Sequence, residues 1–319
     1  MRLATLTFAL LGSAALAQPA SSPDDIARAQ AARAAADQKP DGPGTGPFAA
    51  VKEADPSLPE HVVYRPKDLS KLGNRKLPIL VWGNGGCSPD GASARFHLSE
   101  IASHGYLAIA PGKILSGPGA PPRAPFQPAP PGAPRQLSAE TSAADVAAGI
   151  DWAIAENSRD GSPYKGRIDT SKIAVAGHSC GGLQAIQVGA DKRIKTVIVH
   201  NSGIFADGSN PIAGLEVNKS LLNRLHTPVL YVLGGKSDVA WHNGTDDFAK
   251  IDKVPVVLAD IDVGHGGTFD QPNGGEVARV TVDWLKWQLD GDKQAAKTFV
   301  GNDCGLCTDS KWTIERKGL

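Results

Sequence analysis

The clearest pattern along the chain is an alternation of short apolar runs with longer stretches in which apolar residues recur at helical spacing. The runs are rich in β-branched and aromatic residues and predict strands at 61–66, 77–83, 106–112, 172–177, 196–203, 228–235 and 254–261. Helices are predicted at 94–105, 141–157, 181–190 and 276–289. Because most of the runs are apolar at consecutive positions, the pattern favours an α/β fold, with a mostly parallel sheet covered by helices on both faces.

The first 47 residues lie outside this alternation. Residues 1–17, MRLATLTFALLGSAALA, combine an early arginine, an apolar run and a small-x-small end, which predicts a secretory signal peptide cleaved before Gln18. Residues 18–47 have almost no large apolar side chains and predict a flexible leader. We therefore expect a secreted or periplasmic protein with a single domain at residues 48–319.

A proline-rich segment interrupts the predicted domain. Residues 111–136 contain nine prolines and cannot form a helix or a central strand. The segment follows the third predicted strand, and open α/β sheets bind ligands beyond the carboxyl ends of their strands. This loop is therefore a candidate border of the active site.

The charge balance narrows the choice of partners. Thirty-three basic residues match thirty-three acidic ones, and loss of Arg2 with the signal peptide leaves a net charge of −1 (32 minus 33). Neither nucleic acid nor an anionic membrane surface is expected as a partner, and no second long apolar run follows the signal. The expected oligomeric state is a monomer.

The strongest chemical motif is centred on Ser179. The sequence KIAVAGHSCGG places Gly177-His178-Ser179-Cys180-Gly181 between a predicted strand and a predicted helix. This is the context of a nucleophile elbow, G-x-S-x-G, in which a sharp turn presents the serine hydroxyl at the end of the sheet. We therefore expect Ser179 to be a catalytic nucleophile.

A serine nucleophile needs a base and an acid that orients the base. In this fold class the order along the chain is Ser, then Asp or Glu, then His. His265 lies in a glycine-rich loop after the last predicted strand, and Asp238 follows the strand before it. The sequence thus predicts a Ser179–His265–Asp238 triad, with Asp207 as the alternative acid.

An oxyanion hole requires two backbone N–H groups. One normally belongs to the residue after the nucleophile, here Cys180, and the other to a loop after an early strand, here GNGGC at 83–87. Gly86 and Cys87 both qualify as the second donor. Three further residues near these loops are candidate substrate contacts: Trp82, Trp241 and His178.

The four cysteines suggest two disulfides. Cys87 and Cys180 flank the predicted oxyanion hole, and Cys304 and Cys307 are close in sequence, so we expect these two pairings. The first would clamp the oxyanion loop to the elbow. A zinc site needs more ligands than Cys304 and Cys307 supply, and neither a metal nor another cofactor is expected.

Together the motifs GHSCGG, WGNGGC, GGKSD and GHGG resemble those of the α/β-hydrolase fold. The similarity is greatest to secreted serine esterases of the dienelactone hydrolase and cutinase-like polyester hydrolase branch, over residues 48–300. It implies an eight-stranded, mostly parallel sheet and a Ser-His-Asp triad that works through an acyl-enzyme. Dienelactone hydrolases proper have a cysteine at the position of Ser179, and the cutinase-like enzymes have an aromatic residue in the oxyanion loop.

The expected function is therefore hydrolysis of small or polymeric carboxylic esters by a secreted serine esterase. Two alternatives within the same chemistry are a polyester hydrolase, acting on cutin-like or terephthalate polymers, and a carbohydrate acetyl esterase. A catalytically inactive hydrolase fold used for binding is the alternative from another class.

Overall fold

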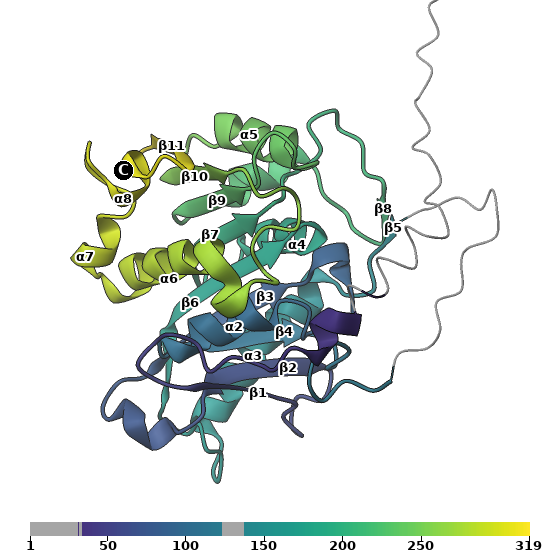
Figure 1. Ribbon diagram of the computed structural model, residues 1–319, viewed down its shortest axis with the longest axis vertical. Coiled ribbons are helices and arrows are strands. Elements are labelled where there is room, and N and C mark those ends of the chain that lie inside the picture. Colours follow the sequence, from purple (N-terminus) through teal and green to yellow (C-terminus); the bar gives the residue numbers. More distant parts are fainter. Residues whose placement is uncertain (1–30, 32–33, 123–136) are drawn as a thin grey trace, which may run out of the picture.

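The computed structural model describes residue 31, residues 34–122 and residues 137–319 (Figure 1). The predicted signal peptide and residues 123–136 of the proline-rich segment lie outside the described residues. The main-sheet strands are β1 (Ala50–Glu53), β2 (His61–Pro66), β3 (Leu77–Gly83), β4 (Leu107–Pro111), β6 (Ile168–His178), β7 (Ile194–His200), β9 (Val229–Leu233), β10 (Val256–Ile261) and β11 (Trp312–Lys317). Two short strands, β5 (Leu137–Ser138) and β8 (Ile212–Ala213), form a separate parallel pair.

Helices connect most of the strands. The α-helices are α2 (Arg95–Ser103), α3 (Ala143–Ser158), α4 (Cys180–Val188), α5 (Trp241–Lys250), α6 (Gly275–Asp290), α7 (Lys293–Ala296) and α8 (Gly305–Thr308). Short 3-10 turns are η1 (Leu69–Leu72), η2 (Gly85–Cys87), η3 (Lys219–Arg224) and η4 (Pro272–Gly274). Strands and helices alternate through the central part of the chain, as the hydrophobic pattern predicts.

The main sheet has the order β1-β2-β4-β3-β6-β7-β9-β10-β11. The six central strands, from β4 to β10, pair in parallel, whereas β1–β2, β2–β4 and β10–β11 are antiparallel. The expected count of eight strands is wrong, because the described residues form a nine-stranded sheet. In the strands at its two edges, β1 and β11, at least half of the residues are polar, so both carry little of the apolar signal that identifies the central strands.

The sheet has a hydrophobic core on each face. Alternate residues of one strand face opposite sides, so Ile79 and Val81 belong to the core cluster that includes residues of α3, α4 and α5, whereas Leu80 and Trp82 belong to the cluster that includes residues of α2 and α6. Figure 1 shows α2 and α6 on one side of the sheet and α3 behind it. Because both faces are covered, β3 is buried at every position, which explains its unbroken apolar sequence.

The end of the predicted leader contacts the domain. Asp41 forms an ion pair with the buried Arg95 on α2 at 2.9 Å, and the Thr45 N–H donates to the Glu100 carboxylate at 2.7 Å. Residues from position 41 onward therefore add partners to two buried polar groups of α2, since Arg95 also donates to the Ala36 and Lys39 carbonyls and Glu100 also contacts His104.

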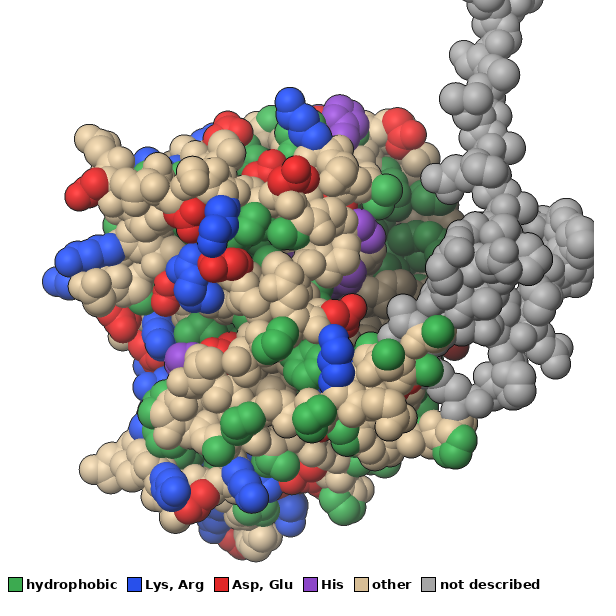
Figure 2. Space-filling view, viewed as in Figure 1, with side chains coloured by type: hydrophobic (Ala, Val, Ile, Leu, Met, Phe, Trp, Pro, Cys, Tyr) green, Lys and Arg blue, Asp and Glu red, His purple; other side chains and the backbone are tan. Residues whose placement is uncertain are grey.

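Charged side chains are interspersed over the face shown in Figure 2, with no broad area of one sign. Within the described residues no helix is both long and apolar enough to cross a bilayer. The structure pairs Cys304 with Cys307 and Cys87 with Cys180, as the sequence predicts. Both disulfides are compatible with an oxidising compartment.

The core under α2 contains an unusual group of aromatic rings. Trp82, His97, His200 and Phe269 lie with ring centroids 5.0–5.7 Å apart. All four nitrogens of His97 and His200 are buried and have no hydrogen-bond partner among the described residues. Burial lowers the pKa of His97 to about 3 and holds the pKa of His200 well below its ordinary value, so both rings are neutral in the folded protein.

We predict that this group makes the protein acid-sensitive. An unfolded histidine binds a proton below about pH 6.5, whereas buried His97 resists protonation, so its contribution to stability is complete above that pH and is lost as the pH falls toward 3. His97→Leu should therefore reduce the loss of unfolding free energy between pH 7.5 and pH 5 by about 2 kcal/mol. Urea unfolding at the two pH values measures this difference. The surface variant His242→Leu serves as the control, and an unchanged pH dependence in His97→Leu would contradict the prediction.

Candidate active site

Ser179 occupies the sharp turn between β6 and α4. Its φ of 54° lies in the left-handed region that non-glycine residues rarely adopt. The Ser179 N–H donates to the His200 carbonyl at 3.0 Å, and the Ser202 hydroxyl donates to the Ser179 carbonyl at 2.6 Å. Both backbone groups of the turn are thus held by the end of β7, which stabilises the strained conformation.

Glycines are required beside Ser179 because three backbone segments meet there. A Cβ on Gly177 would lie 2.1 Å from the Gly181 carbonyl oxygen, and a Cβ on Gly181 would lie 2.0 Å from the Gly83 oxygen. No side chain fits into these gaps. The start of α4 can therefore cross β3 and β6 at backbone contact distance, which explains the spacing of the G-x-S-x-G motif.

The structure brings the three predicted triad residues together. The Ser179 Oγ lies 2.9 Å from His265 Nε2, and His265 Nδ1 lies 2.6 Å from Asp238 Oδ1. Asp238 follows β9 and His265 follows β10, so the side chains meet beyond the carboxyl ends of neighbouring parallel strands. The alternative acid, Asp207, is exposed and accepts a hydrogen bond from the Ser209 N–H at 2.9 Å.

Asp238 is a buried carboxylate with a full set of donors. Besides His265, its oxygens accept hydrogen bonds from the Ala240 N–H at 2.9 Å, the Gly234 N–H at 3.2 Å and Asn201 Nδ2 at 2.9 Å. Burial by itself raises the pKa of Asp238, but the hydrogen bonds, with that to His265 first, outweigh burial and lower the pKa below its ordinary value. Asp238 is therefore ionised at neutral pH and places a negative charge beside His265.

His178 lies beside the triad within the elbow. Its Nε2 lies 2.8 Å from the His265 carbonyl oxygen and therefore carries the proton of that hydrogen bond. Burial lowers the pKa of His178 to about 4, so the ring is neutral at neutral pH. His178 thus anchors the backbone of the histidine loop and is absent from the cavity wall described below.

Of the candidate oxyanion donors, one is already engaged. The Cys87 N–H donates to the Asn84 carbonyl at 3.0 Å. The Gly86 and Cys180 N–H groups have no acceptor in the part of the chain that the structure describes. Gly86 is therefore the better second donor, and it takes a left-handed φ of 65° that suits glycine.

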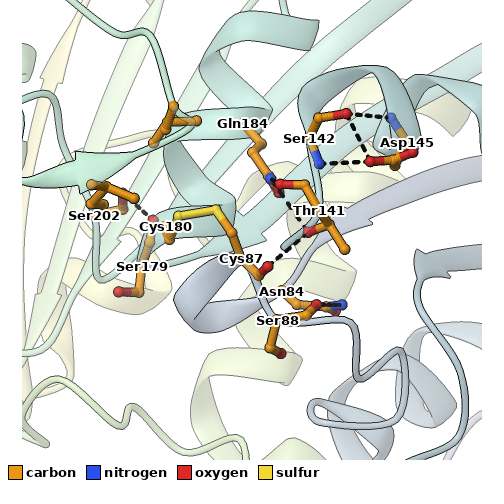
Figure 3. The surroundings of a disulfide bond; sticks show 12 residues. Asn84, Cys87, Ser88, Thr141, Ser142, Asp145, Ser179, Cys180, Gln184 and Ser202 are labelled. Atoms are coloured by element: carbon orange, nitrogen blue, oxygen red, sulfur yellow. Dashed lines mark hydrogen bonds between the residues drawn. A yellow bond between two sulfur atoms is a disulfide. The ribbon is translucent and has the colours of Figure 1, made fainter. Parts of the chain in front are cut away.

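A disulfide joins the two sides of this donor pair. Cys87 and Cys180 are bonded, with their Cα atoms 5.2 Å apart, and Figure 3 shows the bridge directly beside Ser179. The Cys87 carbonyl also accepts hydrogen bonds from the backbone and hydroxyl of Thr141, and Gln184 on α4 donates to the Thr141 carbonyl at 2.5 Å. The oxyanion loop is thus tied to α4 covalently and through Thr141 (Figure 3).

A cavity of about 260 Å³ opens at Ser179. Its other lining residues are Leu137, Cys180, Leu183, Asn201, Ser202, Gly203, Phe205, Pro211, Ile212, Val239, Ala240, Asn243 and His265. Among the described residues, the wall carries no Lys, Arg, Asp or Glu. Leu137 and Val239 are 62% and 77% exposed and are two of the three large apolar side chains that are exposed within the described residues. The cavity therefore suits an uncharged, largely apolar group.

A larger cavity of about 750 Å³ lies elsewhere, near Phe48, Lys67 and Arg167. Its lining contains no triad residue and no histidine or cysteine. Among the described residues no three His, Cys, Asp or Glu side chains converge as metal ligands. The cavity at Ser179 is therefore the better candidate site, although it is the smaller one.

The two tryptophans predicted to contact substrate do not line the catalytic cavity. Trp82 is fully buried in the core on the other face of the sheet. Trp241 begins α5, and its indole N–H donates to Asp260 at 2.8 Å. Trp82 thus serves core packing and Trp241 forms a hydrogen bond, and the sequence pattern does not distinguish these roles from contact with a ligand.

Several residues of the site are not predicted by the sequence. Asn201, Ser202, Phe205 and Val239 lie in loops that follow strands, and Leu137 lies in the separate two-stranded pair. The nearest sequence signal is the polar pair Asn201-Ser202 at the end of the apolar run TVIVH. The remaining positions depend on how long loops return over the sheet, and local patterning does not contain that information.

A scan against protein-family models matches no family, and a search of curated proteins finds no match. The geometry of the site is therefore the basis for a proposed function.

Proposed function

We propose that this chain is a serine hydrolase of the α/β-hydrolase type that cleaves carboxylic esters through an acyl-enzyme on Ser179. One observation supports the proposal most strongly. Hydrogen bonds of 2.9 and 2.6 Å connect Ser179 to His265 and His265 to Asp238, and Ser179 and His265 line an open cavity. This series of hydrogen bonds has the geometry that activates a serine hydroxyl.

Acylation begins with His265 as the general base. Its Nε2 takes the hydroxyl proton as Ser179 Oγ attacks the ester carbonyl carbon. Asp238 accepts the hydrogen bond from Nδ1–H, which selects the tautomer whose Nε2 is free to accept a proton and stabilises the imidazolium that forms. The imidazolium then donates its proton to the leaving alkoxide, so the alcohol departs and the acyl group remains on Ser179.

The negative charge on the carbonyl oxygen needs stabilisation during this step. The N–H groups of Gly86 and Cys180 are the available donors, and the start of α4 adds a favourable helix dipole. Each such donor contributes roughly 3 kcal/mol in enzymes of this class. Since the Cys87–Cys180 disulfide links the two loops, the donors are held in place before the substrate binds.

Deacylation repeats the same chemistry with water. His265 removes a proton from water as the oxygen attacks the acyl carbon, and then returns a proton to Ser179 Oγ. The acid product leaves and the triad is restored, so neither a metal nor a redox cofactor is needed for the cycle.

The cavity wall favours neutral esters. Its described residues include no Lys or Arg that would bind a substrate carboxylate, and burying an unpaired carboxylate there would cost free energy. The exposed apolar side chains of Leu137 and Val239 favour a polyester hydrolase over a carbohydrate acetyl esterase as the more specific candidate, since they offer an apolar rim to a polymer chain. The predicted signal peptide and the two disulfides support export of the protein.

Ser179→Ala should abolish hydrolysis of p-nitrophenyl esters, with a loss of at least about 1,000-fold, because no other group can form the acyl-enzyme. A fluorophosphonate probe should label the wild type and spare the variant. Ser171→Ala, on the exposed part of β6, is the matched control and should retain activity and labelling. Labelling of the Ser179 variant at the wild-type rate would contradict the assignment.

The disulfide beside the site should affect both stability and rate. A Cys87→Ser/Cys180→Ser double variant should lose roughly 4 kcal/mol of unfolding free energy, since that bridge closes a loop with a sequence separation of 93 residues. Its kcat should fall by about 10-fold or more as the oxyanion donors lose their preorganisation.

The second disulfide provides the control. Cys304→Ser/Cys307→Ser removes a bridge with a sequence separation of 3 residues, remote from the site, and should cost about 2 kcal/mol without changing kcat. Urea unfolding and ester kinetics on both double variants test the difference. Equal kcat in the two double variants would show that the bridge next to Ser179 has no catalytic role.

A further inference from the structure

Asn201 is the first residue after β7, lines the cavity at Ser179 and is 1% exposed. Its φ of 45° is in the left-handed region, where asparagine is one of the few tolerated residues. The Asn201 N–H donates to the Val232 carbonyl at 2.8 Å, which fixes the backbone against β9. The side chain is therefore presented at a defined position between two catalytic loops.

The two amide protons of Asn201 have different acceptors. Nδ2 donates to Asp238 Oδ2 at 2.9 Å and to the Gly264 carbonyl at 3.0 Å. The reversed amide would place Oδ1 against a carboxylate and a carbonyl, so these acceptors determine its orientation. Gly264 directly precedes His265, and a single side chain thus joins the acid loop to the histidine loop.

We propose that Asn201 is a positioning residue of the triad, which locks Asp238 to the His265 loop and shares the negative charge of the Asp238 carboxylate. The inference rests on the proposed function for its catalytic consequence. The effect of Asn201 on the protonation of His265 can be measured without a substrate.

The charge-sharing role follows from the donors around Asp238. Oδ2 accepts from Asn201 and from the Gly234 N–H, and Oδ1 accepts from the Ala240 N–H and faces His265. Asn201 is the side-chain donor in this set that does not titrate, so a substitution can remove it without touching the backbone. Its loss concentrates negative charge on Asp238 and strengthens the attraction to the His265 imidazolium.

His178, Asp260 and Asp262 are the other ionisable groups that lie near Asp238 and His265 in the described part of the chain. His178 contacts His265 and is neutral at neutral pH, since burial lowers the pKa of His178 to about 4. Asp260 and Asp262 face the Asp238 loop, where the Asp260 carboxylate accepts from the Gly235 N–H and the Asp262 carboxylate from the Ser237 hydroxyl. None of these groups contacts Asn201, so its substitution leaves their hydrogen bonds intact.

Two variants separate positioning from folding. Asn201→Gly removes the amide and keeps the left-handed φ without strain. Asn201→Asp keeps the shape but, when ionised, places a carboxylate against Asp238 and donates to neither acceptor. Asn157→Ala is the matched control, because it removes a 2.9 Å side-chain hydrogen bond, to the Ile168 N–H, that is remote from the site.

We expect Asn201→Gly to lower kcat by about 10-fold, the effect of losing a hydrogen bond to a charged group, with KM within about twofold of the wild type. The acid limb of the kcat/KM profile and the NMR titration midpoint of the His265 ring should both move to higher pH. Asn201→Asp should lose at least as much kcat at pH 8, whereas Asn157→Ala should leave both readouts unchanged.

An unmoved His265 titration in folded Asn201→Gly and Asn201→Asp would overturn the inference, even if kcat fell. If the wild type does not hydrolyse esters but the NMR midpoint still moves in Asn201→Gly, the proposed function fails and the positioning role stands. If Asn201→Gly does not fold, the His265 titration in the isosteric Asn201→Asp decides the question by the same criterion.

Discussion

The site depends on one close backbone crossing, in which the first turn of α4 lies directly against β3 and β6. Glycines at positions 83, 177 and 181 permit this contact, since a Cβ on any of them would lie within 2.4 Å of a carbonyl oxygen. The crossing forces Ser179 into its strained φ and brings the Cys180 N–H towards the loop after β3. Ser179, the Cys87–Cys180 disulfide shown in Figure 3 and the proposed oxyanion donors therefore all lie at this one crossing.

A second constraint is the buried charge of Asp238. An unpaired carboxylate at this depth would cost several kcal/mol, and four hydrogen-bond partners offset that cost. Those partners belong to three strand-end loops, after β7, β9 and β10, so satisfying the carboxylate also aligns the loops. Stability and the proposed catalysis thus require the same arrangement, and Asn201 contributes to both.

Much of this arrangement is predictable from local sequence. Continuous apolar runs identify the central strands, and Ser179, Asp238 and His265 stand out by their positions after strands. Local sequence does not predict the edge strands β1 and β11 or the helix α5, because half or more of their residues are polar. The position of α5 depends partly on its buried Asp247, which accepts a hydrogen bond from Lys219 at 2.6 Å. The sequence places Trp82 next to the oxyanion loop, but neighbouring residues of a strand face opposite sides of the sheet, and its side chain lies in the core on the other face. Asn201 could not be found, since its role arises from contacts with residues 37 and 63 positions away.

The most direct test of the central claim is trapping of the covalent intermediate. Wild-type protein mixed with excess p-nitrophenyl acetate should release a burst of about one equivalent of p-nitrophenol, if deacylation is the slower step, and acid quenching should preserve an acetyl group on the peptide that contains Ser179. Ester turnover with the acetyl adduct on another residue, or a burst with no adduct on the Ser179 peptide, would contradict the account.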